Sequence, residues 1–182
     1  HLTTRRQRQM CIRDRSDSYQ EFIDFLADWP ISTVTGWNSN DLLSDEHNCY
    51  SGRPGSVGNR AGNFSVQLSD CVLIVGCRLN IRQLSFNWES FARNAWTCHV
   101  DIDNSELNKP FLNTDLKVLS TVKGLFPRLS KELENLTNQG FQSKTKVFDR
   151  WLQWSKFGKK YLRIYHPLKE MTSKKFDCIN PY

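Results

Sequence analysis

A glycine-rich stretch at residues 52–62, GRPGSVGNRAG, is the part of this sequence best suited to contact a ligand. Glycine permits positive φ angles and lets the backbone approach a bound group closely. Residues 63–68 have helical character, and the N-terminus of a helix can receive an anion. The stretch is neither a dinucleotide G-x-G-x-x-G motif nor a P-loop, because no Lys-Ser or Lys-Thr pair follows its last glycine. Two interpretations remain, a turn without a ligand and a loop that contacts an anion.

Two arginines follow an apolar run that predicts a buried strand. Cys71–Val75 has the continuous apolar pattern of a strand covered on both faces of a parallel sheet, and Gly76 ends it. Ligands of open α/β sheets bind outside the carboxyl ends of the strands. Arg78 and Arg82 lie in the turn beyond this strand, where they can meet a phosphate. A solvated or salt-bridged arginine pair is the alternative.

The next predicted strand, at residues 96–102, ends in acidic residues. Asp101 and Asp103 flank Ile102 at what we expect to be the same edge of the sheet. Their carboxylates suit the hydroxyl groups of a ribose or a ribityl chain. Alternatively, they cap the turn into Asn104.

The sequence shows no arrangement typical of a catalytic or metal centre. It contains no nucleophile elbow, no H-E-x-x-H motif and no paired carboxylates in an apolar setting. The six cysteines form no C-x-x-C pair and the four histidines are scattered, which argues against zinc. We therefore predict no catalytic residue and no metal ligand in this chain. The cysteines are interpreted as reduced thiols, with Cys71, Cys77 and Cys98 in the core.

The net charge of +6 comes from the two ends of the chain. Residues 1–15 carry five arginines against one acidic residue, and residues 141–182 carry ten basic residues against three acidic ones. The stretch between them holds ten basic and fifteen acidic residues, which does not match the basic face of a nucleic-acid-binding protein. No apolar run reaches the roughly 18 residues of a membrane span. We predict a soluble cytoplasmic protein without nucleic-acid or membrane partners.

Helices and strands alternate along residues 16–140, which predicts an α/β domain with a mostly parallel sheet. The expected elements are a helix capped by Ser16 or Ser18 and stopped by Pro30, a strand at 31–35, a helix at 63–68, strands at 71–75, 96–102 and 115–119, and an amphipathic helix at 122–136. Pro127 must then lie in the first turn of the last helix.

The two ends of the chain differ from this domain. Residues 1–15 are rich in arginine, and the run 9–15 resembles translated adapter sequence, so we interpret them as a non-native or disordered segment. Residues 141–182 are rich in Lys, Trp and Tyr. We expect a helix at 147–161 there, followed by an extended connector.

An ordered set of short motifs resembles the central domain of acetolactate synthase large subunits, which are thiamine-diphosphate-dependent enzymes. The resemblance extends through residues 17–182 in register, and the set is specific although no single motif is decisive. The motifs are TGWN at 35–38, DL at 41–42, YSGRPG at 50–55, GNRAGNF at 58–64, SD at 69–70, GCRL at 76–79, RQ at 82–83, VDID at 100–103, ELNKP at 106–110 and INPY at 179–182.

The resemblance implies a Rossmann-like, three-layer domain with a parallel sheet, within a parent enzyme of the transferase or lyase class. That parent decarboxylates a 2-keto acid and transfers the resulting unit, in branched-chain amino acid biosynthesis. In the family, thiamine diphosphate and Mg²⁺ are bound by an N-terminal domain and by a Gly-Asp-Gly motif of a C-terminal domain. Gly-Asp-Gly does not occur in this sequence.

We therefore interpret residues 16–140 as the central domain and residues 141–182 as a helix and linker toward the diphosphate-binding domain. The chain is expected to be a fragment without catalytic activity of its own. Its expected partners are the N- and C-terminal domains of the same chain and further copies in a homodimer or homotetramer. The alternatives are a free-standing nucleotide- or flavin-binding module without catalysis and the central domain of a related 2-keto acid decarboxylase.

The central domain of acetolactate synthases holds FAD in a structural role. By position, the resemblance assigns cofactor contacts to Gly55, Ser56, Val57, Gly58, Gly76, Cys77, Arg78, Arg82, Asp101 and Ile102. The sequence departs from the family pattern where residues 56–57 replace Met-His and where residues 80–81 replace an Asp pair. FAD, ADP and no ligand therefore all remain open for this domain.

The register of the resemblance also implies an incomplete sheet. In the family an apolar strand precedes the helix that starts here near Ser18, and residues 1–15 are almost without β-branched residues. We expect this strand to be absent, which would leave unpaired backbone edges and an aggregation-prone product.

Overall fold

Three parallel strands form the sheet in a computed structural model, which describes residues 17–39, 41–84, 86–140, 144–158 and 160. The strands are β1 (Cys71–Val75), β2 (Trp96–Asp101) and β3 (Leu116–Leu119), in the spatial order β1-β2-β3. The helices are α2 (Tyr19–Asp28), η1 (Trp37–Ser39), α3 (Arg60–Gln67), α4 (Ile81–Leu84), η2 (Trp88–Ser90), α5 (Asn104–Leu107), α6 (Leu125–Asn138) and α7 (Lys144–Phe157). The predicted α/β class with a parallel sheet is confirmed.

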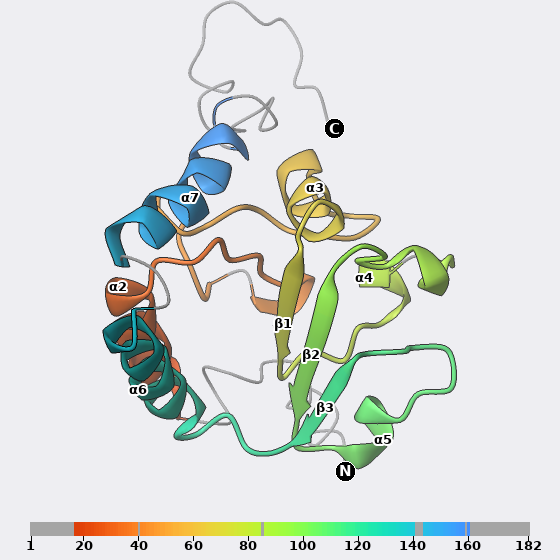
Figure 1. Ribbon diagram of the computed structural model, residues 1–182. Coiled ribbons are helices and arrows are strands. Elements are labelled where there is room, and N and C mark those ends of the chain that lie inside the picture. The colour runs from red at the N-terminus through yellow and green to blue at the C-terminus, as the bar shows by residue number, and fades with distance from the viewer. Residues whose placement is uncertain (1–16, 40, 85, 141–143, 159, 161–182) are drawn as a thin grey trace, which may run out of the picture.

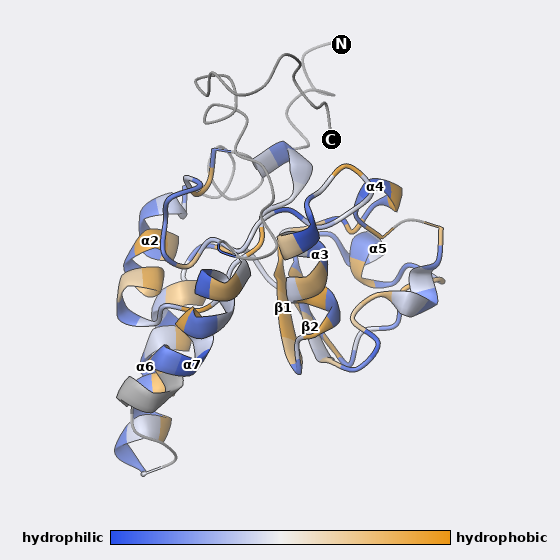
Figure 2. Cartoon of the chain, turned by 90° about the horizontal axis from the view of Figure 1, so that it is seen from above, coloured by the Kyte–Doolittle hydropathy of each residue, from blue (hydrophilic) through white to orange (hydrophobic). Residues whose placement is uncertain are grey.

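Helices lie on both sides of the sheet. α2, α6 and α7 gather on one side, and α4 and α5 lie on the other (Figure 1). Figure 2, turned by 90°, shows the same division, with the mainly hydrophobic strand β1 between the two groups. This is the three-layer, Rossmann-like arrangement expected when helices and strands alternate along the chain.

The larger hydrophobic core lies among α2, α6 and α7. Phe22 and Phe25 of α2 pack against Phe126 of α6, with ring centroids 5.2 and 5.4 Å apart. Trp29, directly after α2, meets Phe148 of α7 edge to face at 5.6 Å. The apolar residues of α2 recur at spacings of three and four, which places them on one face of the helix. The three helices therefore share one core.

A second, smaller core lies on the α4 side of the sheet. It contains Ile74 of β1, Leu84 of α4 and two loop residues, Leu79 and Leu112. All four side chains are buried. This cluster fixes the turn after β1 and α4 relative to the sheet, and the turn carries several of the predicted site residues.

The prediction that both faces of β1 are buried was wrong, and β1 also lies at an edge of the described sheet. Among the described residues it pairs with β2 alone. Ile74 is buried, whereas Leu73 is 36% exposed. Cys71 is also exposed and Cys77 is half-buried, so of the three cysteines predicted for the core only Cys98 of β2 is fully buried. An apolar run identifies a strand but does not reveal which elements cover its faces.

Residues 31–35 do not form a strand of the sheet, so that prediction was also wrong. Thr33 makes an isolated parallel bridge to Tyr50. Thr33 N donates to Cys49 O at 2.7 Å, and Ser51 N donates to Thr33 O at 2.8 Å. The segment satisfies its backbone groups by pairing with the loop that leads into the glycine-rich stretch.

Helix boundaries differ from the predictions by a few residues. α3 begins at Arg60 because Asn59 caps it, with Asn59 Oδ1 accepting a hydrogen bond from Gly62 N at 2.8 Å. Pro127 lies in the first turn of α6, as predicted. The α-helix α7 spans Lys144–Phe157, and Gly158 and Lys160, which also lie in the predicted range, are π-helical. Within the described ranges, no helix has both the length and the apolar character needed to cross a membrane.

Candidate functional site

The glycine-rich stretch packs directly against α4. Ser56 N donates to the carbonyl oxygen of Arg82 at 2.9 Å, and Ser56 Oγ donates to the same oxygen at 3.3 Å. Gly55 has a φ of +113°, and a Cβ atom at this position would lie 2.1 Å from that oxygen. Only glycine therefore allows the stretch to approach α4 this closely.

Two asparagines hold the shape of the stretch, and the sequence analysis missed both. Asn59 Oδ1 accepts hydrogen bonds from the backbone nitrogens of Arg53 and Gly62, at 3.3 and 2.8 Å. Asn63 Oδ1 accepts from Gly55 N at 2.7 Å, and Asn63 Nδ2 donates to Gly55 O at 3.2 Å. The tendency of asparagine side chains to bond nearby backbone groups was the available signal.

The turn after β1 connects α4 to β2. Gln83 Nε2 of α4 donates to Cys77 Sγ at 3.1 Å. The carbonyl oxygen of Cys77 in turn accepts a hydrogen bond from His99 Nε2 of β2 at 3.0 Å. The glycine-rich stretch, the turn after β1 and the end of β2 thus form one continuous region, which we call the candidate site.

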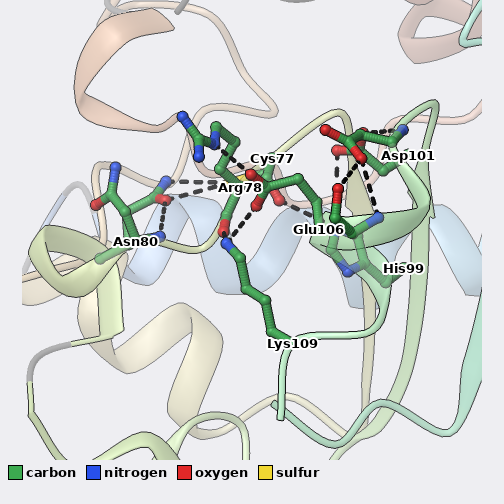
Figure 3. Close-up of polar contacts among 10 residues, drawn as sticks. Cys77, Arg78, Asn80, His99, Asp101, Glu106 and Lys109 are labelled. Atoms are coloured by element: carbon green, nitrogen blue, oxygen red, sulfur yellow. Dashed lines mark hydrogen bonds and ion pairs between the residues drawn. The ribbon is translucent and has the colours of Figure 1, made fainter. Parts of the chain in front are cut away.

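Three charged residues link the turn after β1 to α5. Arg78 Nε lies 2.6 Å from Glu106 Oε1. Figure 3 shows Lys109 reaching the same carboxylate from another direction, and Lys109 also donates to the backbone carbonyl of Arg78. The side chain of Glu106 is 10% exposed and that of Arg78 is 54% exposed. Arg78 is therefore a salt-bridged arginine, as one alternative proposed, although half of its side chain faces solvent.

The acidic residues at the end of β2 have local structural roles. Asp103 caps α5 by accepting from Ser105 N at 2.9 Å, and hydrogen bonds from the Ser105 hydroxyl and amide lower the pKa of Asp103. Asp101 is buried, and its Oδ1 accepts from Asp103 N at 2.9 Å. Ile102, in contrast, is 72% exposed. The capping alternative is confirmed for Asp103, and the Asp101 carboxylate faces the protein interior.

His99 is fully buried within the candidate site. Because the Cys77 carbonyl can only accept, Nε2 carries the proton, and Nδ1 has no hydrogen-bond partner among the described residues. The charges that act on His99 come from Asp101 on β2, with Oδ2 4.0 Å from Nε2, and from Glu106 and Lys109 beside it. Burial outweighs the two carboxylates and lowers the pKa of His99 below its ordinary value.

Acidification is therefore expected to destabilise the chain through His99. Its pKa is lower in the folded state, so the unfolded chain binds the proton more tightly. The stability contributed by neutral His99 is complete above the unfolded pKa of about 6.5 and is lost as the pH falls toward the folded pKa, at no more than about 1.4 kcal/mol per pH unit. Urea unfolding at pH values from about 8 to about 5 measures this loss.

Two variants test the assignment of this pH dependence. His99→Gln retains a donor for the Cys77 carbonyl but does not titrate, so its stability should change less over the same pH range. His47→Gln is the matched control, because it removes a histidine outside the candidate site, where His47 Nδ1 accepts a hydrogen bond from Cys49 N at 3.2 Å. An unchanged slope in folded His99→Gln protein would contradict the assignment.

Comparison with known proteins relates the chain to one family. The model of the family described as thiamine pyrophosphate enzyme, central domain, matches residues 13–129. An acetolactate synthase large subunit from Lactococcus lactis is 31% identical over 113 residues, which cover 62% of this chain and 19% of that protein. The acetolactate synthase isozyme 2 large subunit of Escherichia coli is 29% identical over 159 residues, covering 86% of this chain and 28% of that protein.

A probable acetolactate synthase large subunit from Methanococcus aeolicus is 27% identical over 124 residues, which cover 68% of this chain and 20% of that protein. The chain thus spans about a fifth of the length of the first two curated relatives it matches. The matched residues 13–129 contain all three segments of the candidate site.

Proposed function

The chain belongs to the family of thiamine pyrophosphate enzyme central domains, and we propose that it is the middle part of an acetolactate synthase-like enzyme. In such an enzyme, thiamine diphosphate is the cofactor for the decarboxylation of a 2-keto acid and for the transfer of the resulting unit. The proposed parent carries the N- and C-terminal domains on the same chain and assembles as a homodimer or homotetramer. We propose that the parent enzyme lies in the cytoplasm and takes part in the synthesis of branched-chain amino acids.

The residues of this chain do not fit thiamine diphosphate and its Mg²⁺. The sequence has no Gly-Asp-Gly motif. In the part of the chain that the structure describes, no group of three or more His, Cys, Asp or Glu residues is arranged to hold a metal ion. We assign both groups to the other domains of the proposed parent, and residues 141–182 to the linker toward one of them.

The role we propose for this chain itself is to bind a phosphate-bearing nucleotide, either FAD or ADP. The observation that carries this proposal is the meeting of the glycine-rich stretch with the turn after β1 and the end of β2. Arg82 is exposed and forms no ion pair within the described residues. Arg78 is held at Nε by Glu106, which orients its exposed guanidinium. Two such guanidinium groups suit the diphosphate of a nucleotide.

Titration of FAD and of ADP into the purified chain, followed by calorimetry, tests this proposal. We expect one of them to bind and Arg78→Ala to weaken binding about tenfold, because a charge-assisted hydrogen bond to phosphate is lost. Arg93→Ala changes an exposed arginine outside the candidate site and should leave the affinity unchanged. If neither nucleotide binds, the nucleotide-binding role is wrong.

The proposed parent is tested separately. The coding sequence beyond Tyr182 should continue into a segment that contains Gly-Asp-Gly, and the longer protein should convert a 2-keto acid when supplied with thiamine diphosphate and Mg²⁺. A reading frame that stops without this segment would instead favour a free-standing nucleotide-binding module.

A further inference from the structure

A groove of about 500 Å³ lies at the amino ends of β1 and β2, away from the turn after β1 and the end of β2. One wall is the last part of α3, which leads into β1, and the other is the loop that leads into β2. The side chains used below are Phe64, Gln67, Leu68, Ser90, Arg93 and Asn94. Trp96 N donates to Asp70 O at 2.9 Å, which holds the two segments together.

Two apolar side chains of α3 line this groove instead of joining the core. Phe64 is 44% exposed and Leu68, directly after the helix, is 64% exposed. Residues four apart in a helix lie on the same side of it. Ala61, Ser65 and Val66 are buried on a different side. Phe64 and Leu68 therefore give the groove an apolar wall that stays exposed in the described part of the chain.

The loop before β2 carries an unpaired cation into the same groove. Ala92 is buried with a φ of +44°, which residues other than glycine rarely adopt, and Ala95 N donates to Ala92 O at 2.8 Å. Arg93 and Asn94 follow Ala92, and both are exposed. The Arg93 side chain forms no ion pair or hydrogen bond with a described residue. No described carboxylate lines the groove, so its charge is positive.

We propose that this groove binds a small carboxylate with an apolar body. A guanidinium matches a carboxylate with two parallel hydrogen bonds, so the carboxylate pairs with Arg93. The apolar body lies against Phe64 and Leu68, and the amide of Asn94 can bond a polar substituent. Apolar walls with a few polar groups and a volume of about 300–1,000 Å³ are typical of small-molecule sites. This ligand is separate from the nucleotide of the proposed function, because the groove lies at the other end of the strands.

Two probes that differ only in charge test the proposal. 4-Phenylbutyrate and its uncharged amide, 4-phenylbutyramide, are titrated into the full 182-residue chain by calorimetry. We expect the carboxylate to bind about tenfold more tightly than the amide, because it alone forms a charge-assisted hydrogen bond with Arg93. If the wild type binds neither probe, or binds both equally, the proposal is overturned.

Two variants separate the charge from the apolar wall. Arg93→Gln should lower the affinity for 4-phenylbutyrate about tenfold, to that of the amide, and leave the affinity for the amide unchanged. Leu68→Ser should weaken binding of both probes about fivefold, because both lose apolar contact. Both side chains are exposed, so the urea midpoints should stay at the wild-type value. A structural role of Arg93 would not make the effect depend on the charge of the probe.

Arg150→Gln is the matched control, because it removes an exposed arginine of α7 that does not line the groove. It should bind both probes like the wild type, and an equal loss in Arg150→Gln and Arg93→Gln would overturn the proposal. Sedimentation velocity tests a different occupant. If the wild type self-associates and Leu68→Ser does not, the groove is an interface between copies of this chain and the ligand proposal is wrong.

Titration of FAD and ADP into the same proteins distinguishes this inference from the proposed function. If a nucleotide binds through Arg78 and 4-phenylbutyrate does not bind, the nucleotide site stands and the carboxylate groove is wrong. If 4-phenylbutyrate binds through Arg93 and neither nucleotide binds, the groove stands and the nucleotide-binding role is wrong.

Discussion

Gly55→Ala is expected to destabilise the chain by about 3 kcal/mol, the sum of an unfavourable positive φ and a steric clash. The backbone at this position has a φ of +113°, and the new Cβ atom would lie 2.1 Å from the carbonyl oxygen of Arg82. Relief requires the stretch to move away from α4, which breaks the hydrogen bond from Ser56 N. Urea unfolding measures the loss, and nucleotide affinity should fall with it.

Gly124→Ala is the matched control for this substitution. Gly124 also has a positive φ, +75°, but no atom lies within 4 Å of the Cβ position. Its cost should therefore be limited to the backbone term of about 1–2 kcal/mol. Equal losses at the two positions would show that contact between the glycine-rich stretch and α4 is not what requires glycine at position 55.

Phe126→Ala is expected to destabilise the chain by about 3–5 kcal/mol, the usual range for removal of a buried aromatic ring. Phe126 is 3% exposed and contacts the rings of Phe22 and Phe25. The substitution leaves a cavity between α6 and α2, next to these two rings. Thermal or urea unfolding of the purified variant gives the magnitude.

Leu136→Ala in the same helix provides the comparison. Leu136 is 44% exposed, and an exposed leucine replaced by another good helix former should change stability by no more than about 0.5 kcal/mol. A similar loss in the two variants would contradict the position of the core. In that case the apolar side of α6 would be buried over its whole length.

The sequence predicted strands and helices well where neighbouring residues along the chain determine them. The apolar runs of β1 and β2 have the composition of strands whatever lies beside them. The neighbours of an element are decided by the rest of the fold, which explains the two errors in the sheet. Residues 31–35 pair with a loop, and Leu73 of β1 is exposed although its sequence resembles that of an interior strand.

The candidate site divides in the same way. The glycine-rich stretch and the turn after β1 could be found because they directly precede a helix or follow a strand. The pairing of Arg78 with Glu106 spans 28 residues, and no local pattern indicates it. Similarly, the sequence places Arg53 in the glycine-rich stretch, but only the folded structure shows that its Nε is buried without a hydrogen-bond partner among the described residues.

Asn59 and Asn63 have a consequence for recognition. Their two side-chain amides form hydrogen bonds with four backbone groups of residues 53, 55 and 62. The conformation of the stretch is therefore set by residues of the same chain. The loss of conformational entropy needed to order this segment occurs during folding. A ligand that arrives later meets a preorganised surface, and more of its interaction energy remains available as affinity.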